Sequence, residues 1–389
     1  LQVPELSVTA NIFDYYVDSL TIIKAQTKLY SIGYNINTQD FYDYQTIRDL
    51  ASHILRNSIS NSGASQNEIP IIENLIKPIN STNTFNNILL FGVTGFLGSH
   101  ILYELLTKTK SRIYCVIREK DNINAIERFY EKFHFYFPNE NLRNYSHRIN
   151  LITGNILKDN FNLPDEQYDF LGNNIDCVIS SAALVKHYGK YEEFYNTNVK
   201  SVEKLINFAD TFKKKLFHIS TLSVSGNALV DQYYMEQEFS EEIDFCENNF
   251  YIGQSLENVY IRSKFEAEKR ILDAILKGTD AYILRVGNLM PRMSDGKFQE
   301  NISENAYISR LKAFIKLGVI PQYLEDDYME FTPIDYTATA IMKIIKYTNN
   351  ENRIYHIFNN NHVFVKDVLK IIKDIKIVEN EIFKEIIKK

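Results

Sequence analysis

The stretch that decides the fold is LLFGVTGFLGSH, residues 89–100. It begins as an apolar strand, places glycines at 92, 95 and 98, and runs on into the helical pattern SHILYELLTK. The first glycine would permit a tight turn, the second would let the backbone approach a pyrophosphate, and the third would let the helix pack on the strand. We therefore predict a dinucleotide site rather than a ligand-free glycine-rich turn. Its residues are Gly92, Thr94, Gly95, Phe96, Leu97 and Gly98.

Short apolar runs alternate with helical segments on both sides of this turn. The expected strands lie in residues 87–93, 112–118, 149–155, 176–183, 216–224 and 281–288. Such alternation predicts parallel strands joined by crossover helices, and the fold class is therefore α/β with a doubly wound parallel sheet. We assign residues 86–290 to this nucleotide-binding domain. From about Pro291 helical patterns dominate, and residues 291–389 are expected to form a smaller, mainly helical substrate lobe that partly returns to the sheet.

The N-terminal segment has a different character. Residues 1–57 hold two helical patterns, one from about Ser19 to Leu29 and one with Ile47, Leu50 and Ile54 at helical spacing. A polar stretch rich in Ser and Asn follows, and we interpret residues 58–85 as a linker.

Composition limits the possible partners and the compartment. With 389 residues and 45% hydrophobic content, the chain is expected to be globular. Lys and Arg number 43 against 49 Asp and Glu, so no basic field favours nucleic acid. The three distant cysteines predict buried free thiols and a cytoplasmic location, and no apolar run is long enough to span a membrane. We expect no metal site.

A second motif follows the strand that ends in STLSV. Tyr260 and Lys264 are four residues apart, a spacing that puts the phenol and the ammonium on one face of a helix. A lysine charge beside the ring would stabilise the phenolate and lower its pKa from about 10, which improves proton transfer near neutrality. Thr221 would supply a second hydroxyl to polarise a carbonyl. We predict Thr221, Tyr260 and Lys264 as the catalytic residues.

From about residue 86 onward the chain resembles an extended short-chain dehydrogenase. The resemblance rests on the GxxGxxG turn, STLS and the Tyr/Lys pair. It implies that Ser181, Ala182 and Ala183 lie beside the cofactor, that Lys264 also reaches the nicotinamide ribose, and that Val185 and Asn288 belong to the substrate pocket.

The residue after the second expected strand bears on cofactor choice. An acidic residue there marks NAD, because it binds the ribose 2′-hydroxyl. This chain has Arg118 instead, whose guanidinium can pair with a 2′-phosphate. Strand alternation points Glu119 away from that face. We predict NADPH as the cofactor, against the alternative of an exposed surface arginine.

The N-terminal stretch NIFDYYVDSLTII, residues 11–23, resembles the signature of carrier proteins around the serine that receives phosphopantetheine. DFYDYQTIRDLASHI, residues 40–54, resembles the last helical region of such carriers. The resemblance implies Ser19 as the attachment site, against the alternative of an ordinary helix N-cap. We expect residues 1–57 to be a partial carrier, since Leu1 would fall near the end of the first carrier helix.

Together the two parts resemble the terminal thioester reductase module of a nonribosomal peptide synthetase. This implies NADPH-dependent release of a carrier-bound peptidyl or aminoacyl thioester as an aldehyde, or further as an alcohol, with upstream synthetase modules as partners. A reductase of fatty acyl, aryl or polyketide thioesters is the nearest alternative. A nucleotide-sugar epimerase or dehydratase is more distant, because it has no use for a carrier. A non-catalytic NADP-sensing protein would lack the Tyr/Lys pair.

Overall fold

The structure is a computed structural model of the chain. It describes residues 7–15, 22, 25, 29, 36, 38–60, 82–120, 123–186, 188–226, 245–302, 305–325, 328–348, 352–361, 363–371 and 375–388. The chain divides into two compact units. One comprises residues 1–81, 225–256 and 272–278, and the other comprises residues 82–224, 257–271 and 279–389. The second unit contains the predicted nucleotide-binding turn and all three predicted catalytic residues.

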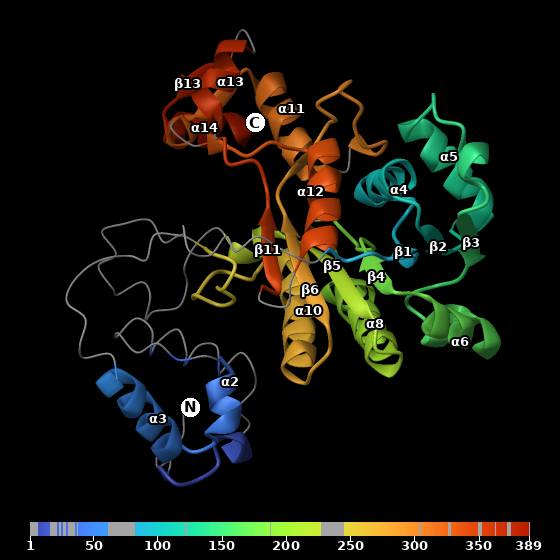
Figure 1. The fold of residues 1–389 in the computed structure, drawn as a ribbon. Coiled ribbons are helices and arrows are strands. Elements are labelled where there is room, and N and C mark those ends of the chain that lie inside the picture. Colours follow the sequence, from blue (N-terminus) through green and yellow to red (C-terminus); the bar gives the residue numbers. More distant parts are fainter. Residues whose placement is uncertain are drawn as a thin grey trace. The chain divides into compact units, whose positions relative to one another are not determined.

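A seven-stranded parallel sheet forms the centre of the second unit (Figure 1). Every neighbouring pair of strands is parallel. The connection reverses direction between β1 and β4, which is the point where doubly wound sheets bind ligands. The predicted fold class is thus confirmed. In spatial order the strands are β3 (Ile149–Thr153), β2 (Arg112–Ile117), β1 (Asn87–Phe91), β4 (Cys177–Ser180), β5 (Lys215–Thr221), β6 (Ala281–Val286) and β11 (Ile354–Ile357).

Helices cover both faces of this sheet (Figure 1). One face carries α4 (Phe96–Lys108), α5 (Ala125–Tyr136) and α12 (Ile334–Tyr347). The other carries α6 (Asp165–Asn174), α8 (Lys200–Thr211) and α10 (Val259–Leu276). A short helix, α7 (Tyr191–Phe194), and a π-helical segment, Tyr195–Val199, lead into α8. The 3-10 turns are Ile12–Tyr15, Leu142–Tyr145, Asp159–Asn162, Leu222–Ser225 and Gln322–Leu324.

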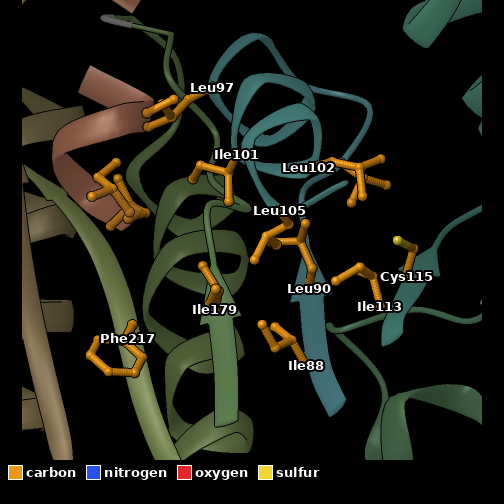
Figure 2. Close-up of a cluster of buried hydrophobic side chains, with 14 of the residues drawn as sticks. Ile88, Leu90, Leu97, Ile101, Leu102, Leu105, Ile113, Cys115, Ile179 and Phe217 are labelled. Carbon is orange, nitrogen blue, oxygen red and sulfur yellow. The ribbon is translucent and has the colours of Figure 1, made fainter. Parts of the chain in front are cut away.

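The main core lies between α4 and the sheet. Leu97, Ile101 and Leu105 recur at helical spacing on α4, and all three are buried. Figure 2 shows Leu105 next to Leu90 of β1, and Leu97, Ile101 and Ile88 belong to the same buried cluster. Full burial of each such side chain stabilises the fold by about 1.5–3 kcal/mol relative to exposure. This packing fixes the start of α4, and therefore the glycine turn, relative to the strand ends.

The C-terminal part adds helices and several short strands. The helices are α11 (Ala306–Leu317), α13 (Val365–Ile371) and α14 (Asn380–Ile387). α11 ends because Gly318 adopts a left-handed conformation with φ of 67°. Three two-stranded sheets pair β7 (Leu289–Met290) with β10 (Thr332–Pro333), β9 (Tyr328–Met329) with β12 (Val363–Phe364), and β8 (Val319–Pro321) with β13 (Lys376–Val378).

The N-terminal segment contains α2 (Thr38–Asp43) and α3 (Ile47–Ser60). Thr46 caps α3, since its hydroxyl accepts a hydrogen bond from Asp49 N at 3.1 Å. Ile22 and Leu50 are buried in a small apolar cluster. Ser19, the predicted phosphopantetheine site, lies outside the described residues, as do residues 61–81 of the predicted linker.

Candidate active site

The glycine turn between β1 and α4 is closed by contacts that leave no room for side chains. Gly92 has a φ of 88°, which favours glycine, and its backbone carbonyl accepts a hydrogen bond from Gly95 N at 2.9 Å. A Cβ on Gly98 would lie 2.1 Å from Gly92 O and 2.7 Å from Ser181 Oγ. Gly95 occupies the N-cap of α4 without a side-chain cap, so the first backbone N–H groups of the helix can face an anion.

A cavity of about 460 Å³ opens at this turn. Most of the residues predicted to bind the cofactor line it, namely Gly92, Thr94, Gly95, Phe96, Arg118, Ser181, Ala182 and Ala183. Leu97 and Gly98 are buried, with Leu97 part of the core behind the turn. The cavity lies at the switch point between β1 and β4, and a dinucleotide with its pyrophosphate at the start of α4 fits this arrangement.

Five cationic residues line the cavity: Arg118, Lys120, Arg128, Lys132 and Lys186. Arg118 follows β2 directly and is exposed, and Arg128 of α5 donates a hydrogen bond to Arg118 O at 2.7 Å. Lys132 forms an ion pair with Glu300, which also lines the cavity. Sequence reasoning found Arg118 and missed the other four, because the local sequence does not show that they line the same cavity.

The three predicted catalytic residues lie at the carboxyl end of β5 and the first two turns of α10. Thr221 ends β5, is buried, and its hydroxyl is hydrogen-bonded to Tyr260. Ser223 N also donates to Thr221 Oγ1 at 3.1 Å. Burial raises the pKa of Tyr260 to about 12, and the hydrogen bond with Thr221 acts in the opposite direction. The phenol is therefore protonated at neutral pH and can donate a hydrogen bond.

The Lys264 ammonium does not act on the Tyr260 phenol as expected. Its Nζ donates to Ile219 O at 2.8 Å and lies 3.0 Å from His218 Nε2. The predicted lowering of the Tyr260 pKa is therefore wrong for this structure, because the ammonium is directed at β5 and burial dominates. Burial lowers the pKa of Lys264 to about 8, while the negative charge of Glu268 raises it. Burial and the Lys264 charge lower the pKa of His218, so its ring is neutral and accepts from the ammonium.

The predicted substrate-side residues are exposed. Val185 is 57% exposed and lines the cavity. Asn288 lies between β6 and β7 with an exposed side chain, and its backbone N–H donates to Glu330 Oε2 at 2.7 Å. The adjacent Gly287 lets this carboxylate approach, since a Cβ there would lie 2.3 Å from Glu330 Oε1.

Asn198 is a buried residue that sequence reasoning missed. It lies in the π-helical segment before α8 and bonds both backbone groups of Leu184, accepting from N at 2.7 Å and donating to O at 3.0 Å. Its amide also donates to Ser263 Oγ at 2.9 Å. Asn198 thus ties the cofactor-side loop to the helix that carries Tyr260 and Lys264. The isolated asparagine in an ordinary helical pattern gave no signal.

Within the described part of the chain, no group of three or more His, Cys, Asp or Glu side chains is placed to hold a metal ion. Among the same residues, none of the helices combines the length and the apolar character that a membrane crossing requires.

The fold and the site define a class: a dinucleotide-dependent oxidoreductase of the short-chain dehydrogenase type, with a cavity at the glycine turn and with Thr221, Tyr260 and Lys264 at the end of β5 and the start of α10. The sequence profile of an NAD-binding family described as male sterility protein matches residues 90–341, and the chain belongs to this family. A second profile, for the phosphopantetheine attachment site, matches residues 1–54. The chain therefore joins a phosphopantetheine-attachment segment to an NAD-binding reductase domain.

Several solved and curated proteins resemble the chain. A thiolation-reductase di-domain from an archaeal non-ribosomal peptide synthetase is 35% identical, with a TM-score of 0.69 over 79% of this chain and 81% of that one. The L-2-aminoadipate reductase large subunit of Candida glabrata is 28% identical over 66% of this chain and 19% of its own length. A Dictyostelium discoideum protein described as "Probable polyketide synthase 44" is 30% identical over 56% of this chain and 7% of its own. The chain thus spans about a fifth or less of these curated relatives.

Proposed function

We propose that this chain uses NADPH to reduce a thioester held on a phosphopantetheine arm and releases the acyl group as an aldehyde. The observation that carries the proposal is the Thr221–Tyr260 hydroxyl pair at the end of β5, in a chain whose N-terminal segment matches a phosphopantetheine attachment site. The solved relative that pairs a thiolation domain with a reductase domain supports the same assignment, in which the N-terminal segment carries the thioester and the second unit reduces it.

The hydroxyl pair suits a carbonyl oxygen that gains negative charge. Thr221 and Tyr260 donate hydrogen bonds to it, and such fixed donors stabilise the developing oxyanion. When bound, the nicotinamide supplies the hydride that reduces the carbonyl carbon. Tyr260 gives its proton to the oxygen as the carbon is reduced and takes it back as the C–S bond breaks. One proton from solvent then goes to the sulfur of the arm, which leaves an aldehyde and a free thiol.

The cationic residues that line the cavity support NADPH over NADH. Arg118 and Arg128 can each donate charge-assisted hydrogen bonds to a 2′-phosphate. Their hydrogen bonds to an uncharged 2′-hydroxyl would be weaker. Lys264 would hold the nicotinamide ribose after exchanging its bond to His218. The phosphopantetheine arm would be attached at Ser19.

The acyl group belongs to one of two classes. Similarity to the peptide synthetase di-domain favours a peptidyl or aminoacyl group, and similarity to a polyketide synthase favours a polyketide acyl group. An epimerase acting on nucleotide sugars shares the cofactor turn but has no role for the attachment segment.

The decisive experiment compares Tyr260→Phe with wild type on carrier-loaded acyl thioesters, with NADPH oxidation and product mass as readouts. Tyr260→Phe should lose at least a hundredfold in kcat and keep its NADPH affinity, because the proton donor is removed while the ring stays. Tyr103→Phe, which loses a hydroxyl bonded to Glu140, is the matched control and should behave as wild type. Near-native turnover by Tyr260→Phe would overturn the mechanism, and an alcohol formed with two NADPH per chain would overturn the aldehyde product.

The attachment site is tested separately by intact mass. Incubation with a phosphopantetheinyl transferase and coenzyme A should add one arm to wild type and none to Ser19→Ala. Addition of an arm to Ser19→Ala would assign the arm to another residue.

A further inference from the structure

A row of polar side chains crosses the buried face of the sheet beneath α10. Ser220 of β5 is in register with Arg285 of β6, and Arg285 is in register with His356 of β11. Residues in register on parallel strands point to the same face, so the three side chains form one row. Ser220 and Arg285 are buried, and Arg285 is 0% exposed.

Glu268 of α10 connects this row to the helix. Its Oε2 accepts from Arg285 Nη2 at 2.8 Å and from Nε at 3.1 Å, and its Oε1 accepts from Ser220 Oγ at 2.5 Å. Arg285 Nη1 lies 3.2 Å from His356 Nε2. The carboxylate and the guanidinium are both fully buried. A buried ion pair seldom stabilises a fold more than apolar side chains of similar volume would, so stability alone does not account for this one.

The position of Glu268 on α10 relates it to the site. Tyr260, Lys264 and Glu268 are spaced by four residues and therefore share one stripe of the helix. Ser220, which Glu268 holds, immediately precedes Thr221. One carboxylate thus contacts the strand end that carries Thr221 and lies one turn from Lys264.

Resting on the proposed reductase function, we propose that Glu268, fixed by Arg285, is a positioning residue for thioester reduction: it holds the end of β5 that carries Thr221 and supplies the counter-charge to the Lys264 ammonium. Two roles follow from one side chain. The hydrogen bond to Ser220 sets the place of the Thr221 hydroxyl, and the negative charge keeps Lys264 protonated.

The charges around Lys264 make the second role testable. The groups that face this buried region are Tyr260 and Glu268 on α10, His218 on β5, Arg285 on β6 and His356 on β11. Burial lowers the pKa of Lys264 and the charge of Glu268 raises it, and the resulting pKa is about 8. Without the carboxylate the ammonium form is less stable, the pKa falls, and Lys264 loses its proton at a lower pH.

The test is Glu268→Gln, which keeps the shape and removes the charge. Lysine labelled with 13C at the ε position reports the Lys264 pKa directly by NMR, with the resonance assigned through Lys264→Met. We expect a fall of about one pH unit or more, and the alkaline limb of kcat/KM for NADPH-dependent thioester reduction should move with it. Glu266→Gln on the same helix removes a charge that pairs with Arg262 at the surface, and it should change neither readout.

Two further variants keep the result interpretable. If Glu268→Gln does not fold, Glu268→Gln combined with Arg285→Met removes both buried charges and should still lower the Lys264 pKa. Ser220→Ala keeps the charge, so it should reduce kcat several-fold without moving the alkaline limb. An unchanged Lys264 pKa in the folded charge-removal variants would overturn the proposal. Because the NMR readout needs no turnover, a wild type that binds NADPH but reduces no thioester would instead refute the proposed function.

Discussion

Arg118→Ala is the sharpest test of cofactor choice. Arg118 follows β2, is exposed and lines the nucleotide cavity, where we propose that it binds the 2′-phosphate of NADPH. Truncation to Ala removes the guanidinium and leaves the backbone carbonyl that accepts from Arg128. The substitution therefore deletes one phosphate contact without breaking the tie between β2 and α5.

The expected loss follows from the surroundings of the side chain. A hydrogen bond to a charged group contributes about 1.5–3 kcal/mol, and an exposed position belongs at the lower end because water screens it. Since about 1.4 kcal/mol is a factor of ten in affinity, NADPH binding should weaken roughly tenfold. The loss should not exceed about a hundredfold, because Lys120, Arg128 and Lys132 still line the cavity. NADH lacks the phosphate, so its affinity should change less than twofold.

Calorimetric titration with both cofactors measures this difference. Arg112→Ala is the matched control, since Arg112 is an exposed arginine at the opposite end of the same strand, and it should leave both affinities unchanged. The tenfold loss should shrink as salt is raised, because the contact is electrostatic. Equal losses for NADPH and NADH, or a wild-type preference for NADH, would show that Arg118 does not recognise the phosphate.

Three more outcomes are expected. Gly98→Ala should weaken NADPH binding more than a hundredfold in the same titration, because its Cβ would lie 2.1 Å from Gly92 O and the turn would have to open; wild-type affinity would contradict this. Glu300→Gln should tighten NADPH binding two- to fivefold, because it frees Lys132 for the phosphate, and weaker binding would show that the ion pair shapes the cavity. Burial lowers the pKa of His100 to about 4. Between pH 6.5 and 4 the unfolded chain therefore takes up a proton that the native chain does not, and the free energy of unfolding decreases as the pH is lowered. Thermal unfolding of His100→Gln should therefore depend less steeply on pH in this range, and an unchanged slope would rule this out.

Most of the fold could be predicted from local sequence patterns. The six strands β1 to β6 are short, largely apolar runs, and the glycine turn directly follows the first of them, so that each can be recognised within ten residues. β11 was not predicted, because IYHI is mostly half-buried and mixes polar with apolar side chains. It is an edge strand, which is buried less than the strands at the centre of the sheet.

The site residues could be predicted from the sequence where they lie on one helix, because their spacing along the chain then fixes their spacing in space. Tyr260 and Lys264 share a helix stripe, and the same rule extended by one turn would have found Glu268. The direction of the Lys264 ammonium depends on a contact with His218 of β5, and no local pattern around this histidine indicates that contact. Asn198 and Lys132 gain their roles only from contacts with distant segments, which no local pattern records.

The place of β11 has a practical consequence for exchanging substrate preference between related enzymes. β11 joins the main sheet beside β6, with Ile354 in register with Ile283, although about seventy residues separate the two strands along the chain. The residues from 287 to 353 leave the sheet after β6 and return to it at β11, and their last helix, α12, packs in the main core. A chimera that swaps everything after β6 would therefore replace α12, an edge strand of the nucleotide domain and His356 beside Arg285. A graft limited to residues 287–333 would keep α12, β11 and the main sheet.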